Sequence, residues 1–101
     1  MSIKTQMSED KKTLTIDIIG NFDITAYHDF GDSYKDLSGN DVKVFINMAE
    51  TKYIDSSALG MLLMLRERAG GDDAEVDIIN ASDGIKKILA TANFDKLFNM
   101  V

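Results

Sequence analysis

The sequence predicts a single α/β domain, in which a mixed sheet of four or five strands carries helices mainly on one face. The length of 101 residues is that of one domain, and a hydrophobic fraction of 45% supplies one core without disulfides or metals. Runs with strand-like alternation are separated by runs with helical spacing. The predicted helix at residues 55–70 lies between two predicted strands, residues 42–48 and 75–80. These two strands are expected to be parallel and joined by a right-handed crossover.

The first part of the chain predicts a hairpin. Residues 3–7 are read as a short strand, and residues 13–19 alternate between apolar and polar side chains, as in a strand with one buried face. The polar residues 8–12 between them favour antiparallel pairing. Gly20 and Asn21 are expected to end the second strand.

The first helix is expected to follow a turn in which Phe22 and Ile24 pack into the core, with Thr25 as its N-cap. Its buried face is predicted from spacings of three and four residues, which link Tyr27, Phe30, Tyr34 and Leu37. Residues 38–41 include a glycine and are expected to end the helix. The single histidine, His28, is assigned to the outer face.

The second part of the chain begins with residues 42–48, whose nearly continuous apolar character predicts a central strand. A short polar link then leads to Asp55, where the pattern becomes helical, and the pair of glycines at 70–71 ends this helix. Residues 75–80 predict another strand. Ser82 is expected to cap a last helix whose buried stripe comprises Ile85, Ile88, Leu89 and Ala92.

Asn93 suits the left-handed end of that helix, and residues 97–100 are either a short edge strand or a turn.

The helix that starts at Asp55 is apolar over most of its circumference. Asp and Ser are favoured at helix N-caps, so residues 55–57 mark its first turn. The residues expected to face the sheet are Ala58, Leu59, Leu62 and Leu63, whereas Met61, Met64 and Leu65 extend beyond that stripe. Two interpretations remain open: neighbouring helices cover these residues, or Met61 and Met64 border an exposed docking patch.

Composition excludes several classes of function. The net charge of −6 and the sequence pI of about 4.5 argue against nucleic-acid binding and against a polybasic membrane anchor. The chain has no cysteine and one histidine, and it contains no phosphate-binding loop, so we expect no metal and no cofactor. No signal-peptide pattern and no apolar run long enough to span a bilayer occur, which predicts a cytoplasmic protein without membrane insertion.

Two motifs carry a resemblance to a known family. Residues 54–60, Ile-Asp-Ser-Ser-Ala-Leu-Gly, follow a buried strand, and residues 20–23, Gly-Asn-Phe-Asp, lie upstream. Both resemble motifs of STAS-domain anti-sigma-factor antagonists, with Ala58 at a position where glycine is commoner. The resemblance covers residues 1–101 as one STAS domain. It implies that Ser56 is phosphorylated by an anti-sigma factor with serine-kinase activity, and that a cognate phosphatase removes the phosphate.

The resemblance also implies the surroundings of the phosphorylation site. Asp23, Asp55 and Ser57 would form the environment of Ser56, with Asp23 across from it. The expected partner-contact residues are Asp23, Ser56, Ser57, Gly60, Met61 and Met64. Ser57 is the competing phosphoacceptor, but its hydroxyl is expected to turn towards the backbone or the interior. Asp55 is either a plain N-cap or a group that orients Ser56.

The expected function is therefore partner switching without catalysis, because a nucleophilic serine needs an oriented base and His28 is not placed to supply one. The controlled output would be a sigma factor or another behaviour such as biofilm formation. An alternative is a small structural STAS subunit of a lipid or anion transport complex, which would use the same helix start for docking. A nucleotide hydrolase is the third and weakest hypothesis.

Overall fold

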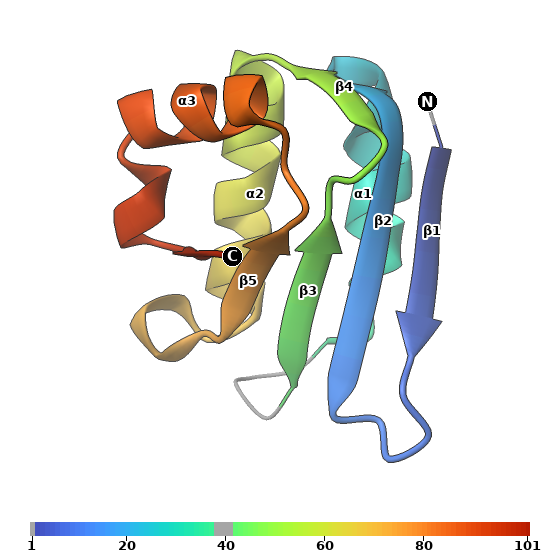
Figure 1. Cartoon of the computed structure of the whole chain (residues 1–101). Helices are drawn as coiled ribbons and strands as arrows, with labels where there is room; N and C mark the ends of the chain where they lie inside the picture. Colours follow the sequence, from blue (N-terminus) through green and yellow to red (C-terminus); the bar gives the residue numbers. More distant parts are fainter. Residues whose placement is uncertain (1, 38–41) are drawn as a thin grey trace.

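The computed structural model describes residues 2–37 and 42–101, and it confirms the predicted α/β class. The described residues form a six-stranded mixed sheet and three α-helices (Figure 1). Helices α1 and α2 lie behind the sheet in Figure 1, and α3 lies beside α2 near β5. The predicted end of the first helix, residues 38–41, falls outside the described part of the chain.

The strands follow the order β1-β2-β3-β5-β6, with β4 paired to β2. Among the described strands, β1 alone is antiparallel to its neighbour, and the other pairs are parallel. The strands are β1 (Ser2–Met7), β2 (Thr13–Phe22), β3 (Lys43–Asn47), β4 (Thr51–Ile54), β5 (Val76–Ile79) and β6 (Asn99–Met100). The helices are α1 (Tyr27–Ser33), α2 (Ser56–Arg68) and α3 (Asp83–Thr91).

Strand β4 corrects the expectation of a polar link before Asp55. It pairs in parallel with the end of β2, from Gly20 to Phe22, and the register shifts between Gly20 and Asn21 within this pairing. Gly20 has φ 93°, a conformation that glycine adopts without strain, and this lets β2 continue past its predicted end. Thr51 is buried, and its hydroxyl donates a hydrogen bond of 2.6 Å to the carbonyl of Ile18. Because this hydrogen bond satisfies the buried hydroxyl of Thr51, the polar segment can lie within the sheet.

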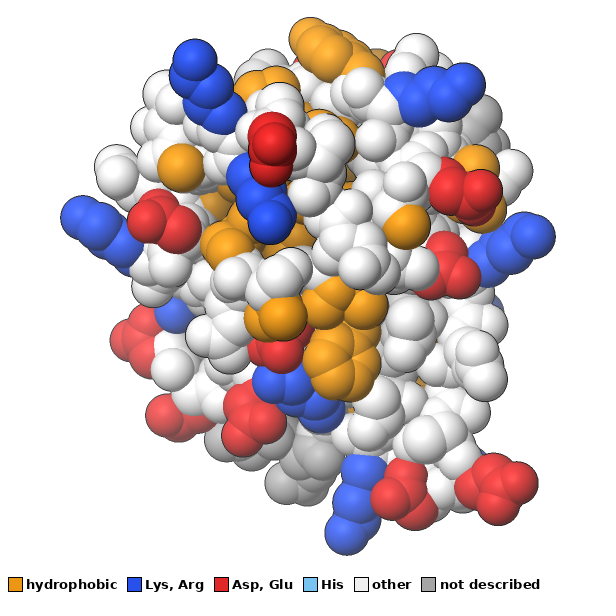
Figure 2. Space-filling model, viewed as in Figure 1, with side chains coloured by type: hydrophobic (Ala, Val, Ile, Leu, Met, Phe, Trp, Pro, Cys, Tyr) orange, Lys and Arg blue, Asp and Glu red, His pale blue; other side chains and the backbone are white. Residues whose placement is uncertain are grey.

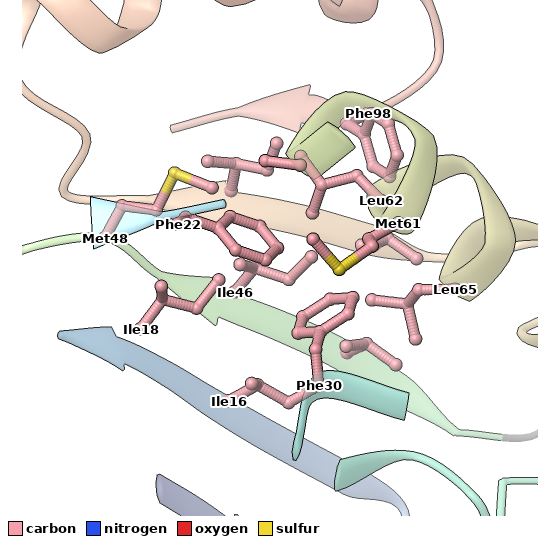
Figure 3. Close-up of a cluster of buried hydrophobic side chains, with 14 of the residues drawn as sticks. Ile16, Ile18, Phe22, Phe30, Ile46, Met48, Met61, Leu62, Leu65 and Phe98 are labelled. Carbon is pink, nitrogen blue, oxygen red and sulfur yellow. The ribbon is translucent and has the colours of Figure 1, made fainter. Parts of the chain in front are cut away.

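The core lies between the sheet and the helices (Figure 3). Phe22 and Phe30 are buried with ring centroids 5.0 Å apart, so the turn after β2 and helix α1 share one packing site. The predicted partners Ile24 and Tyr27 do not join them: their exposed fractions are 61% and 46%. Ile24 is the first residue of a short 3₁₀ turn and Tyr27 is the first residue of α1, and the turn buries Ala26 between them.

Helix α2 buries a different stripe from the one expected. Leu62 and Leu65 are fully buried and Met61 is 4% exposed, whereas Leu63 is 39% exposed. The assignment of Leu63 to the sheet face was therefore wrong, as was the placement of Leu65 beyond it. Neighbouring elements cover Met61 and Leu65, but Met64 remains 49% exposed.

The C-terminal region completes the sheet with a short edge strand. Strand β6 pairs with β5, so Asn99 and Met100 form the expected edge strand, whereas residues 97–98 belong to the turn that precedes it. Ser82 caps α3 as predicted, accepting a hydrogen bond from the Ile85 N–H, and Asn93 has the expected left-handed conformation with φ 63°. Ile88 was predicted to be buried but is 38% exposed.

Two arginines at the end of α2 hold neighbouring loops. The Arg66 Nε donates to the carbonyl of Leu97, and the Arg68 guanidinium donates to the carbonyls of Lys35 and Leu37. These contacts fasten the segment after α1 and the segment before β6 to the C-terminal end of α2. The helix thus anchors both flanks of the domain.

Candidate functional site

The candidate site lies where two neighbouring parallel strands end. Phe22 at the end of β2 is paired with Ile54 at the end of β4, and the Asp55 N–H donates to the Phe22 carbonyl at 3.3 Å. Each strand is followed at once by an aspartate, Asp23 or Asp55. The pairing of β4 with β2 therefore brings two carboxylates, distant in sequence, to one edge of the sheet.

Asp55 is the N-cap of α2, as predicted. It has an extended backbone, with φ −115° and ψ −176°, and its Oδ1 accepts a 3.0 Å hydrogen bond from the Ala58 N–H. This contact satisfies one of the free N–H groups in the first helical turn and sets the direction of the helix. It also fixes the backbone on which the next residue is displayed.

Ser56 is the first residue of α2, and it is exposed. Ser57 is half-buried. A phosphate on a hydroxyl at this position would lie near the positive end of the helix dipole, so α2 would tolerate it. The same phosphate would add a charge of about −1.5 to −2 beside Asp55, and thus alter the surface that any partner meets.

Asp23 caps the 3₁₀ turn Ile24–Ala26 and corrects the assignment of Thr25 as N-cap. Its Oδ1 accepts hydrogen bonds from both the hydroxyl and the N–H of Thr25. These bonds, the one from the Thr25 side chain foremost, lower the pKa of the Asp23 carboxyl below its usual value. Asp23 is therefore a carboxylate held in place at the same sheet edge as Asp55.

The remaining predicted contact residues divide into two groups. Gly60 and Met64 are exposed on the outer side of α2, but Met61 is 4% exposed and is a core residue. Leu63 was missed as a surface residue. The signal was present in the spacing, because steps of four and three residues lead from Ser56 through Gly60 to Leu63 on one side of the helix.

The sheet face opposite the helices presents a different surface. Figure 2 shows hydrophobic side chains in its middle, with acidic and basic ones around them. Lys43 Nζ lies 2.9 Å from Asp77 Oδ1 and 5.6 Å from the Phe45 ring centroid. Asn99 also donates to Asp77, at 2.8 Å. These contacts tie β3, β5 and β6 together across the face.

Metal binding has no candidate within the described residues, where no cluster of three or more His, Cys, Asp or Glu side chains is placed to hold an ion. His28 is exposed and stacks edge-on against Tyr27, with ring centroids 5.6 Å apart. None of the described helices has the length and apolar character needed to cross a membrane.

Comparison with known proteins shows the family. Residues 5–101 match the family model described as "Mlab, STAS domain". The chain is also 42% identical over 100 residues to a STAS-domain-containing protein of Pseudomonas aeruginosa (strain UCBPP-PA14), with 99% of each chain covered. The protein therefore belongs to the STAS-domain family.

Solved structures show the same fold at low sequence identity. A crystal structure from Thermotoga maritima, described as a candidate anti-sigma factor antagonist, matches with a TM-score of 0.79 and 16% identity, covering 97% of this chain and 84% of that one. The phosphorylated form of SpoIIAA from Bacillus matches with a TM-score of 0.67 and 14% identity, covering 99% and 91%. An anti-sigma factor antagonist of Mycobacterium paratuberculosis matches with a TM-score of 0.72 and 15% identity, covering 98% and 85%.

Proposed function

We propose that this chain is a partner-switching regulator of the anti-sigma-factor-antagonist type, controlled by phosphorylation of Ser56. The observation that carries the proposal is the exposed Ser56 at the start of α2, directly after the capping carboxylate of Asp55. The structural neighbours, which include SpoIIAA in unphosphorylated and phosphorylated forms, support the proposal by their fold.

In this proposal the unmodified chain binds an anti-sigma factor that is also a serine kinase. The kinase transfers a phosphoryl group from its nucleotide to the Ser56 hydroxyl, and the added charge lies beside Asp55 on the edge that also holds Asp23. Where the partner buries this edge against its own acidic or apolar side chains, the three negative groups are repelled or lose their hydration without compensation, so binding is lost. A cognate phosphatase hydrolyses the phosphoserine and restores binding. The chain itself acts as a binding module and catalyses no reaction.

Ser56 is favoured over Ser57 because the two hydroxyls differ in access. A kinase must enclose the accepting hydroxyl, and Ser56 is exposed whereas Ser57 is half-buried. The contact surface in this proposal comprises Asp23, Ser56, Gly60 and Met64, with Ser57 at its border; Met61 is excluded by its burial.

The test is site mapping together with binding. Protein isolated from its native cells should carry phosphate on Ser56, detected by mass spectrometry of its peptides. Ser56→Ala should bind the kinase constitutively, and Ser56→Asp should bind it weakly, with Ser57→Ala as the matched control that keeps regulation. Equal binding by wild type, Ser56→Ala and Ser56→Asp would refute the switch.

A second candidate, a structural subunit of a lipid or anion transport complex, is favoured by one observation: the matching family model is described as "Mlab, STAS domain" and not as an antagonist. Such a subunit would dock through the same helix start. If the chain co-purifies with a transport ATPase and Ser56→Asp does not change this association, the structural role is identified. Co-purification with a kinase would instead identify the switch.

A further inference from the structure

Two adjoining, open hollows lie between α1 and α2. One hollow of ≈ 560 Å³ is lined by Tyr34, Leu63, Met64, Glu67 and Arg68, and an adjoining one of ≈ 140 Å³ includes Tyr27, Asp32, Tyr34 and Met64, with the buried Met61 at its floor. Tyr34 and Met64 line both hollows, so the two hollows adjoin each other, and we refer to them together as the α1–α2 groove.

The α1–α2 groove is mainly apolar around Leu63 and Met64, and it becomes more polar towards Tyr27 and Asp32. Met64, Tyr27 and Leu63 are 49%, 46% and 39% exposed, so three large hydrophobic side chains meet solvent around one depression. A helix packed against a sheet normally presents polar residues on its outer side. Large apolar side chains gathered at that position are typical of a surface that another macromolecule covers.

The charges at the groove are mainly negative. Asp32 and Glu67 are exposed at its two hollows, and neither belongs to an ion pair formed among residues 2–37 and 42–101. Arg68 also lines the groove, but its guanidinium donates to the carbonyls of Lys35 and Leu37. Hydrogen bonds to neutral carbonyls leave the positive charge of Arg68 in place, so the two carboxylates outnumber one cation and the groove has a small excess of negative charge, in keeping with a net charge of −6 for the chain.

We propose that the α1–α2 groove receives a basic amphipathic helix of the partner protein, an inference that rests on the proposed function. Two side-by-side helices leave a groove into which the apolar face of a third helix packs. The stretch from Met61 to Arg68 is about 10 Å long at 1.5 Å per residue, which matches two turns of such a helix. Lysine or arginine residues beside its apolar stripe would meet Asp32 and Glu67.

The groove is continuous with the phosphorylation site along α2. Ser56, Gly60, Leu63, Met64 and Glu67 are all exposed, and their spacing places them on one side of the helix. Met64 lies about 12 Å from Ser56 along the helix axis. The groove therefore determines which partner the chain recognises, and the charge on Ser56 determines when that partner binds.

Site-specific photo-crosslinking tests the groove. A p-benzoylphenylalanine probe replaces Met64 in native cells, with the same probe at Ile88, 38% exposed on α3, as a matched control, and at Tyr53, 53% exposed on β4, as a reporter near the site. The Met64 probe should cross-link to a partner segment that has apolar residues at steps of three and four and flanking lysine or arginine, identified by mass spectrometry. The Ile88 probe should give no such product.

Each other outcome overturns the inference. A Met64 cross-link to an acidic or non-helical segment contradicts the proposed occupant, and cross-links from Tyr53 or Ile88 without any from Met64 contradict the groove. In the Tyr53 case the proposed function stands, because the partner still contacts the edge that holds Ser56. Loss of all cross-links together with absence of phosphate on Ser56 would refute the proposed function itself.

A charge test uses the partner once it is identified. Asp32→Lys combined with Glu67→Lys should weaken its binding about tenfold or more at low salt and less at high salt. Asp95→Lys, an exposed carboxylate outside the groove, is the control and should leave the affinity nearly unchanged. Equal effects of the two charge reversals would overturn the inference.

Discussion

The Asp55 N–H donates a hydrogen bond to the carbonyl of Phe22 at 3.3 Å, and this contact joins two parts of the chain that are 33 residues apart. It is the last backbone hydrogen bond between the β2 and β4 segments, and it places Asp23 and Asp55 at one edge of the sheet. Both carboxylates cap the turns that follow them. The site proposed around Ser56 is thus a consequence of strand pairing as well as of a local motif.

The cap at Asp55 should contribute measurably to stability. Asp55→Ala removes the acceptor for the Ala58 N–H and is expected to lower the free energy of unfolding by about 1 kcal/mol. Asp55→Asn keeps an acceptor oxygen and should cost less. Urea denaturation of the two variants measures the difference. An alanine variant as stable as wild type would show that the cap is not needed.

The rotation of α2 can be tested with two leucines on the same helix. Leu65→Ala removes a fully buried side chain and should cost about 2–5 kcal/mol, because it leaves a cavity. Leu63→Ala, at a position 39% exposed, should cost much less. Chemical denaturation compares the two. If Leu63→Ala proved the more destabilising, the orientation of α2 described above would be wrong.

Gly60 offers a test that separates stability from binding. Its position is helical and exposed, and a Cβ added there would meet no atom within 4 Å. Gly60→Ala should therefore stabilise the protein by about 0.8–1 kcal/mol, since alanine is the better helix former. If the partner contacts the backbone here, the added methyl group should weaken binding even though the fold is more stable. Thermal melting and a binding titration give the two readouts.

If Gly60→Ala were less stable than wild type, the conclusion that a Cβ fits at this position without a clash would be wrong. Unchanged partner affinity together with higher stability would remove Gly60 from the contact surface, while leaving Met64 and the α1–α2 groove to be tested by cross-linking.

Asp77 gives the stability a dependence on pH. Burial would raise the pKa of its carboxyl, but hydrogen bonds from Lys43 and Asn99 and the charge of Lys43 outweigh burial, and the pKa is lowered from 3.8. A lowered folded-state pKa adds stability above the unfolded-state value, and that stability is lost as pH falls through the folded-state value. Wild type should exceed Asp77→Asn in stability most clearly above pH 3.8.

Urea unfolding of wild type and Asp77→Asn at pH 6 and at pH 2.5 checks this expectation. The difference between the two proteins should shrink at the lower pH. A difference that is the same at both values would show that the Asp77 charge does not contribute.

Much of the fold follows from local chemistry in the sequence. Alternation of apolar and polar residues predicts β2, and the N-caps at Asp55 and Ser82 follow from side chains that accept free N–H groups within one turn. The left-handed conformation of Asn93 is also local, because asparagine adopts it readily at the end of a helix. Each of these features depends on residues a few positions apart, so the chain specifies them before it folds.

The sequence by itself determined the α/β class, the starts of α2 and α3 and the motif that contains Ser56. Tertiary structure alone decided that Thr51–Ile54 joins the sheet and that α2 buries Leu65 while exposing Leu63. A helix that is apolar on several sides has no preferred rotation until α1, α3 and the sheet pack against it. A four-residue strand likewise has no signal of its own, because its stability comes from pairing with β2.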